Sequence, residues 1–213
     1  MNAVRSLVKL ALGISLLGLI LGGCATSPPA QYYTLAPLQP PGVQAPSVPT
    51  FTVAVGPVIN PDLLQRPQIA TRTSDHQISF SDFHKWAGTL TDETKRVLVV
   101  NLYALLSGAR AAVTTDDMAI DPDYRVVVNI NRFDGRPGGS VWLNAVWTLK
   151  EQKGKMAIAV NQSVIEEPVG GQGYPDLVSA QSRAIGQLSR EIAAGFDEPG
   201  AGPHNGSGVR HVL

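Results

Sequence analysis

The sequence predicts an α+β fold: a largely antiparallel sheet with two amphipathic helices packed on one face. Three β-prone segments, 124–133, 140–150 and 156–165, follow one another with short connections, which is typical of an antiparallel meander. Two longer segments carry apolar residues at helical spacing along one side. A helix with one apolar stripe must bury it against another element, so the simplest packing lays both helices on the sheet.

The first half of the folded region predicts strands and then a helix. Phe51–Val58 alternates and is rich in β-branched residues, so we expect a strand that ends near Pro57. Segments 68–72 and 77–81 are joined by polar turn residues and predict a hairpin. A helix is expected to start within 83–86 and to continue to about Leu106. Its expected apolar face comprises Leu90, Val97, Leu98, Leu102, Leu105 and Leu106.

The second half predicts a short strand, the meander and a second helix. The short strand is expected at Ala111–Thr115. Pro175 stands at the start of the last predicted helix, where proline is favoured. The apolar stripe of this helix comprises Leu177, Ala184, Ile185, Leu188, Ile192 and Phe196.

The first 23 residues have the features of a lipoprotein signal peptide. Arg5 and Lys9 supply positive charge, and the apolar run Leu10–Leu21 is too short to span a bilayer. The run ends in Leu21-Gly22-Gly23-Cys24, where small residues let the chain enter a signal peptidase. We therefore predict cleavage before Cys24, whose thiol takes a diacylglyceryl group. With further acylation, as in triacylated bacterial lipoproteins, the mature chain would be stably anchored.

The residue after the lipidated cysteine indicates the membrane. In enteric bacteria, Asp at this position retains a lipoprotein in the inner membrane, whereas this chain has Ala25. We therefore expect an outer-membrane lipid anchor with the protein facing the periplasm. Cys24 is the only cysteine of the sequence, so neither a disulfide nor a cysteine metal site is expected.

The chain divides into four predicted regions. The signal peptide, 1–23, is followed at 24–50 by a proline-rich, lipid-anchored tether. Inside the tether, Gln31–Leu35 is a β-prone island that could add an edge strand. The α+β domain is expected at 51–196, and the Gly- and Pro-containing tail, 197–213, is expected to be disordered.

The charge of the mature chain argues against nucleic-acid binding. Without Arg5 and Lys9, the 17 Lys and Arg fall to 15, against 17 Asp and Glu. The net charge is then 15 − 17 = −2, so no basic field is available for a polyanion. We expect no nucleic-acid partner.

The residues that could act in catalysis or metal binding do not combine into a recognised site. The histidines lack the i, i+4 spacing of a helical zinc site, and the adjacent Glu166 and Glu167 splay apart. An acidic run at 116–123 lacks the glycine and the closing glutamate of a calcium-binding EF-hand loop. We therefore predict no catalytic residues, no metal and no organic cofactor. The histidines are His76, His84, His204 and His211.

Two tryptophans of one predicted strand should point to opposite faces. Trp142 and Trp147 are an odd number of residues apart, so one can belong to the core while the other needs separate cover. Cover by the domain's own loops is the simpler explanation. An exposed tryptophan at a binding interface is the alternative.

An ordered set of short motifs resembles one known family. In order they are Tyr32-Tyr33-Thr34-Leu35, Val55-Gly56-Pro57-Val58, Leu64-Gln65-Arg66-Pro67-Gln68-Ile69, His84-Lys85-Trp86-Ala87, and Tyr124-Arg125 leading into Phe133-Asp134-Gly135. Over roughly residues 31–195 the chain resembles the ABC-type transport auxiliary lipoproteins, which include the paraquat-inducible protein C group. The order of the motifs is specific, whereas no single motif is.

The resemblance implies a non-catalytic partner of a transporter. Such a lipoprotein would serve a mammalian-cell-entry (MCE) type system that moves lipid between the two membranes, with an MCE-domain protein as its partner. An envelope hydrolase or an outer-membrane assembly factor is the alternative function, and homo-oligomerisation stays open. Neighbouring genes for an MCE protein and an ABC permease would favour the transport role.

Three residues form the predicted partner-binding surface: Leu64, Arg66 and Trp86. The backbone before a proline is held extended, so Arg66, which precedes Pro67, should project where it can bind a carboxylate. Trp86 is placed beside it, at the expected start of the first helix. The simpler alternative is that 63–67 only connects two strands, with Arg66 in solvent.

Overall fold

The structure is a computed structural model, and it describes residues 28–38, 48–118, 121–152 and 156–197. The predicted signal peptide, Cys24 and nearly all of the predicted tail lie outside these residues. In chain order the elements are β1 (Gln31–Tyr33), β2 (Phe51–Ile59), the short 3-10 helix η1 (Asp62–Leu64), β3 (Gln68–Ser74), β4 (Gln77–Trp86), α2 (Leu90–Leu105), β5 (Ala111–Thr115), β6 (Tyr124–Gly135), β7 (Ser140–Glu151), β8 (Met156–Pro168) and α3 (Tyr174–Ala194).

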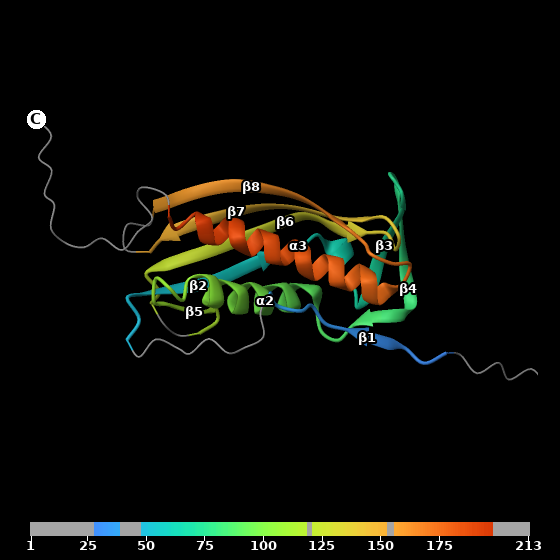
Figure 1. Cartoon of the computed structure of the whole chain (residues 1–213), viewed down its shortest axis with the longest axis horizontal. Helices are drawn as coiled ribbons and strands as arrows, with labels where there is room; N and C mark the ends of the chain where they lie inside the picture. Colours follow the sequence, from blue (N-terminus) through green and yellow to red (C-terminus); the bar gives the residue numbers. More distant parts are fainter. Residues whose placement is uncertain (1–27, 39–47, 119–120, 153–155, 198–213) are drawn as a thin grey trace, which may run out of the picture.

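The predicted meander is present and forms the longest part of the sheet. β6 pairs with β7, and β7 with β8, both antiparallel and over nearly their whole lengths (Figure 1). Along β7, every second residue from Val141 to Leu149 is buried, whereas the residues between them are only half-buried. This alternation confirms the period-two pattern and places Trp147 and Trp142 on opposite faces, as predicted.

The rest of the sheet is mixed. β3 and β4 form the predicted antiparallel hairpin, but β2 lies parallel to both β5 and β6, and β1 lies parallel to β4. The α+β class is therefore confirmed for the described residues, with a sheet of eight strands that is mostly antiparallel. Parallel neighbours need a long crossover, and the chain between β2 and β5 makes one through α2.

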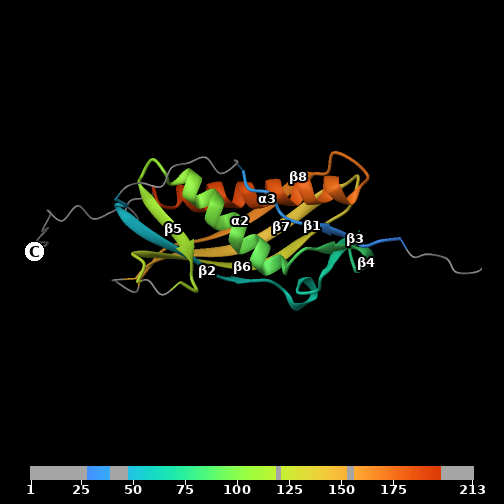
Figure 2. The same ribbon diagram turned by 90° about the horizontal axis from the view of Figure 1, so that it is seen from below.

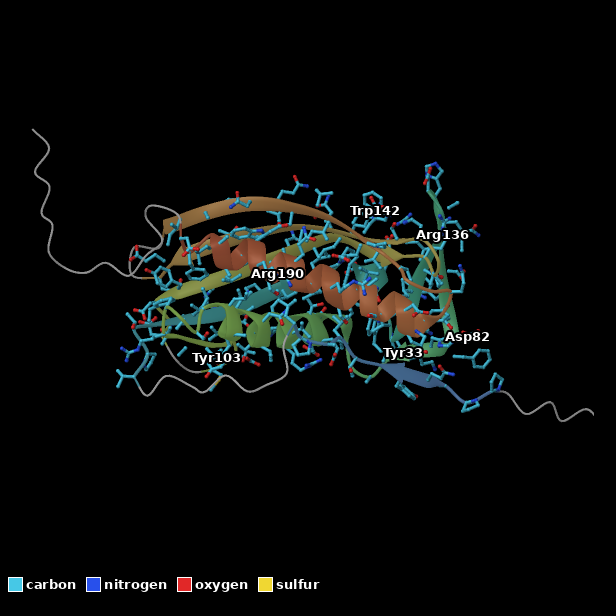
Figure 3. The ribbon with its side chains drawn as sticks, viewed as in Figure 1. Tyr33, Asp82, Tyr103, Arg136, Trp142 and Arg190 are labelled. Atoms are coloured by element: carbon cyan, nitrogen blue, oxygen red, sulfur yellow. The ribbon has the colours of Figure 1, made fainter. Side chains whose placement is uncertain are left out.

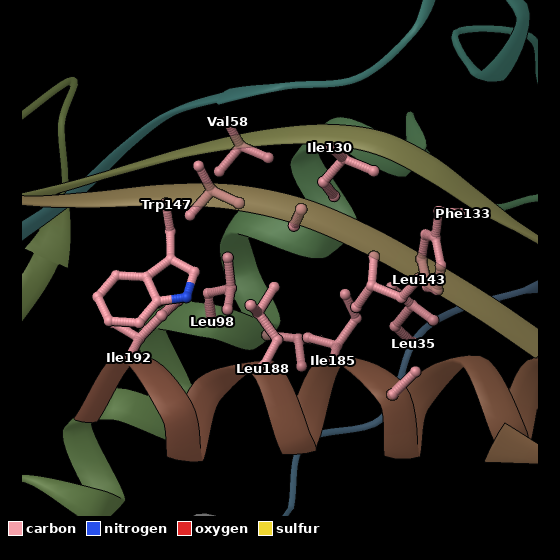
Figure 4. Packing of buried hydrophobic residues seen from close by; sticks show 14 of the residues in the cluster. Leu35, Val58, Leu98, Ile130, Phe133, Leu143, Trp147, Ile185, Leu188 and Ile192 are labelled. Atoms are coloured by element: carbon pink, nitrogen blue, oxygen red, sulfur yellow. The ribbon is translucent and has the colours of Figure 1, made fainter. Parts of the chain in front are cut away.

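The two helices pack on the sheet and on each other. α2 contacts β2 and β5, α3 contacts β7 and β8, and the helices touch along part of their lengths (Figures 1 and 2). Side chains of α3 meet those of β6 and β7 in one core, where Ile185, Leu188 and Ile192 face Leu143 and Trp147 (Figure 4). The core contains the helix stripes predicted from the sequence, except that Leu105 is 39% exposed.

The first helix begins later than predicted. Residues 83–86 belong to β4, and the helix starts at Leu90, after Gly88 and Thr89. The hydroxyl of Thr89 accepts a hydrogen bond of 3.0 Å from the backbone N–H of Asp92, which is a standard N-cap. The spacing of Phe83, Trp86 and Leu90 imitates a helical stripe, but the cap residue marks the true start.

Part of the predicted tether is packed on the domain. β1 lies beside β4, and Leu35, which follows it, is 1% exposed in the same core as Phe133 (Figure 4). The backbone N–H of Leu35 donates to Glu93 Oε2 at 2.9 Å, and that of Leu38 donates to Asn101 Oδ1 at 2.8 Å. An apolar side chain and α2 acceptors therefore hold residues 34–38 against the domain, before its predicted start at residue 51.

Candidate functional site

The predicted partner-binding surface is mostly buried. Leu64 is 5% exposed and belongs to the core, and Trp86 is 4% exposed as the last residue of β4. The placement of Trp86 at the front of a helix was therefore wrong. Its backbone N–H donates to Pro67 O at 2.7 Å, which ties the start of β3 to the end of β4. Both residues stabilise the fold and are not available to a partner.

Arg66 is the member of that surface that reaches solvent. Its guanidinium carbon lies 4.9 Å from the ring centroid of Phe80, a cation–π contact with the neighbouring strand. Within the described residues the guanidinium has no carboxylate partner. Leu63, close by in η1, is 42% exposed. The structure thus places an arginine, an aromatic ring and a leucine near the start of the β3–β4 hairpin.

A second polar cluster lies where β3 meets β6, and sequence reasoning missed it. Arg72 reaches Asp134 through two hydrogen bonds, Nε to Oδ1 at 2.8 Å and Nη2 to Oδ2 at 2.7 Å. Arg132 donates to the same Oδ1 from Nε and Nη2, both at 3.1 Å. Asp134 is 3% exposed, so two guanidinium groups compensate one buried carboxylate.

The protonation of Asp134 follows from this geometry. Burial acts to raise the pKa of this carboxyl, but the hydrogen bonds and charges of Arg72 and Arg132 outweigh it and lower the pKa below the ordinary 3.8. The same bond raises the pKa of Arg72. The cluster is therefore ionised at neutral pH and joins the hairpin to the meander.

An open cavity of about 300 Å³ adjoins this cluster. Arg132 lies over the ring of Trp142, 5.4 Å from its centroid. Arg136 and Glu166 are exposed at the cavity. Trp142 and Arg136 are labelled in Figure 3. Guanidinium groups, carboxylates and an indole line the same recess. Trp142 is therefore half-buried rather than fully covered by loops.

The acidic run is engaged in structural contacts. Lys95 Nζ lies 3.0 Å from Asp116 Oδ1, and Asp123 accepts from the N–H and hydroxyl of Thr52 at 2.9 and 3.0 Å. In the described part of the chain, no three His, Cys, Asp or Glu side chains are grouped so that they could hold a metal ion. The expectation of no cofactor stays a prediction. Among the described residues, no helix is both long and apolar enough to cross a membrane.

Comparison with known proteins gives the class of this chain. The model of the ABC-type transport auxiliary lipoprotein component matches residues 33–193, from the end of β1 almost to the end of α3. The chain belongs to this family, as the ordered motifs predicted. A search of curated proteins found no match.

Two solved structures have a similar fold. One, described as an uncharacterized protein, is 23% identical with a TM-score of 0.66, over 78% of this chain and 98% of the other. The other, protein XCC0632 from Xanthomonas campestris, is 18% identical with a TM-score of 0.61, over 77% of this chain and 93% of the other. At these identities the likeness concerns the fold alone.

Proposed function

We propose that this protein is a non-catalytic, lipid-anchored auxiliary component of an MCE-type ABC system that transports lipid between the membranes. The observation that carries the proposal is the family match, which spans nearly all of the described helices and strands. Cys24 would carry the lipid, and Ala25 favours the outer membrane with the domain in the periplasm. The role requires binding rather than catalysis, and its partner would be an MCE-domain protein.

We place the partner contact on the β3–β4 hairpin. Arg66 and Leu63 are exposed near its start, and the cavity beside Arg72 lies near its tip. A planar guanidinium held over Phe80 has a restricted orientation, which lowers the entropy lost when it binds a carboxylate of the partner. Leu64 and Trp86 support this surface from inside the core.

The test is co-purification from detergent-solubilised envelope, comparing Arg66→Ala with Arg190→Ala. Both arginines are exposed, but Arg190 lies on α3, away from the hairpin (Figure 3). Loss of a binding hot spot costs more than about 2 kcal/mol, roughly a thirtyfold loss of affinity. We expect Arg66→Ala to lose the MCE partner and Arg190→Ala to keep it.

A core variant calibrates the experiment. Leu102 is 0% exposed, so Leu102→Ala should destabilise the domain by about 2–5 kcal/mol. If Arg66→Ala melts as early as Leu102→Ala, Arg66 is a structural residue. If Arg66→Ala retains the partner as well as Arg190→Ala does, residues 63–67 only connect two strands, and the contact lies elsewhere.

A further inference from the structure

The distance between the lipidated residue and the folded domain is short. The described chain starts at Pro28, four residues after Cys24, and β1 begins at Gln31. The seven residues from Cys24 to Gln31 span at most about 25 Å even when fully extended. β1 lies at the end of the molecule formed with β4 (Figures 1 and 2). With Cys24 in the membrane, this end of the domain must stay close to the bilayer surface.

The chain after β1 fixes the orientation of β1 relative to the rest of the domain. Leu35 is buried, and its carbonyl oxygen accepts from Arg96 Nη2 at 2.6 Å. The N–H of Ala36 donates to Ser182 Oγ of α3 at 3.0 Å, and that of Leu38 to Asn101 Oδ1 of α2 at 2.8 Å. Residues 34–38 are thus bonded to both helices, so β1 has a fixed orientation relative to the domain.

The outward side of β1 and β4 exposes two aromatic residues. Tyr32 is 66% exposed and Phe83 is 41% exposed. Tyr32 pairs in register with Lys85, whereas Tyr33 pairs with the buried Trp86, so Tyr32 and Lys85 point away from the core. Phe83 lies two residues before Lys85, and its exposure places it at this surface, since the register of β4 shifts between Phe80 and Lys85.

These side chains match the chemistry of the membrane interface. Tyrosine is enriched at the headgroup level of membranes, where an apolar ring and a polar hydroxyl are both accommodated. The half-buried Lys85 and the exposed Asp82 carry opposite charges, so attraction to anionic lipid is not the main contribution. Isolated exposed aromatics are ordinary. Because these two lie next to the anchored end of the chain, the membrane is the partner that we expect for them.

We propose that the outward side of β1 and β4, with Tyr32 and Phe83, rests on the lipid headgroups of the membrane that holds Cys24. The inference depends on the Cys24 anchor of the proposed function but not on the identity of the transport partner. It gives the anchored domain a definite orientation, with the β1–β4 end at the bilayer. The exposed edge strand β8 then serves as a site that should not touch lipid.

The experiment uses the full lipidated protein in vesicles of phosphatidylethanolamine and phosphatidylglycerol whose acyl chains carry bromine, a quencher of tryptophan fluorescence. The reporter is Phe83→Trp and the matched control is Val164→Trp on β8, a site that is 63% exposed. Both variants keep the three native tryptophans as a common background. We expect the fluorescence added at residue 83 to be lost in brominated vesicles, also at high salt, and that added at residue 164 to be retained.

A second reporter and a flotation assay separate the possible failures. Tyr32→Trp keeps an aromatic ring at the most exposed position, should be quenched like Phe83→Trp, and replaces it if that variant does not fold. Equal quenching at residues 83 and 164, or none at residues 83 and 32, would overturn the proposed orientation, including in favour of a protein partner on this surface. Wild-type protein that fails to float with vesicles would instead refute the Cys24 anchor.

Discussion

The two faces of β7 differ in burial. Toward α3, Val141, Leu143, Ala145, Trp147 and Leu149 are all buried, none more than 3% exposed. On the other side, which we call the open face, the alternating residues Trp142, Asn144, Val146 and Thr148 are half-buried. Successive residues of β7 therefore alternate between the core and the open face. Substitutions on the two faces should differ in stability even when the chemical change is the same.

The open face satisfies its own polar groups. Asn144 Oδ1 accepts from Asn131 Nδ2 at 3.3 Å and from Gln162 Nε2 at 3.1 Å, across three strands. On the core side, Trp147 Nε1 donates to Ser163 Oγ at 3.0 Å, and Ser163 in turn contacts Glu191 of α3. Polar groups on the core side thus join sheet to helix, whereas those on the open face join strand to strand.

The largest effect is expected from Trp147→Ala. The indole is 3% exposed and packs against Gly195 at the end of α3. Its removal would leave a cavity and take away the N–H that donates to Ser163 Oγ, so the free energy of unfolding should fall by about 3–5 kcal/mol. Urea denaturation followed by circular dichroism measures this change. A loss below about 1 kcal/mol would show that the faces do not differ.

Asp134→Asn should have the next largest effect. The residue pairs in register with Trp142 on the open face, but the side chains of Arg72 and Arg132 bind its carboxylate there. Its arginine partners keep 24% and 37% side-chain exposure, so water screens the lost charge and we expect a loss of about 2 kcal/mol. Limited proteolysis should cut the β3–β4 hairpin before the meander.

The pH dependence of the free energy of unfolding tests the role of Asp134 in a second way. Because the pKa of Asp134 is lowered in the folded state, its ionisation stabilises the fold above the ordinary value of 3.8. This stabilisation should be lost as the pH falls from 3.8 through the folded-state pKa. The difference in unfolding free energy between wild type and Asp134→Asn should therefore shrink in acid. A constant difference from pH 6 to pH 2.5 would exclude this origin.

Trp142→Ala should have the smallest effect. The ring is half-buried and its described partner is Arg132, so about 1 kcal/mol or less should be lost. If the proposed function uses the adjacent cavity, co-purification of the MCE partner should fall although the melting temperature hardly changes. Asn144→Ala, also on the open face, is the matched control.

Local periodicity in the sequence predicted most of the strands but not which strands pair with one another in the sheet. The alternation of β7 and the stripe of α3 are periodic over many residues, and the structure confirms both. Residues 83–86 were wrongly assigned to a helix because a few apolar residues fit either period. The parallel pairing of β2 with β5 and β6 depends on long crossovers, which leave no local signal.

The candidate site was harder to predict than the fold. Leu64 and Trp86 are the kinds of residue that serve interfaces and cores alike, and only packing separates the two roles. The Arg72–Asp134 pair joins residues that are 62 positions apart, so it appears only once β3 lies beside β6. Asp134 belongs to the motif Phe133-Asp134-Gly135, but nothing in the local sequence indicates that its carboxylate is buried.

The packing of residues 34–38 across both helices also decides where a mechanical load would act. A pull on the N-terminal end enters through β1, which shares a ladder with β4, and then through bonds to Glu93 and Asn101 of α2 and Ser182 of α3. These bonds lie in series along the chain with the buried Leu35 between them. Tension between the membrane and a partner on the β3–β4 hairpin would therefore be carried first by the β1–β4 ladder, and the bonds to the helices would be loaded only after β1 detaches from β4.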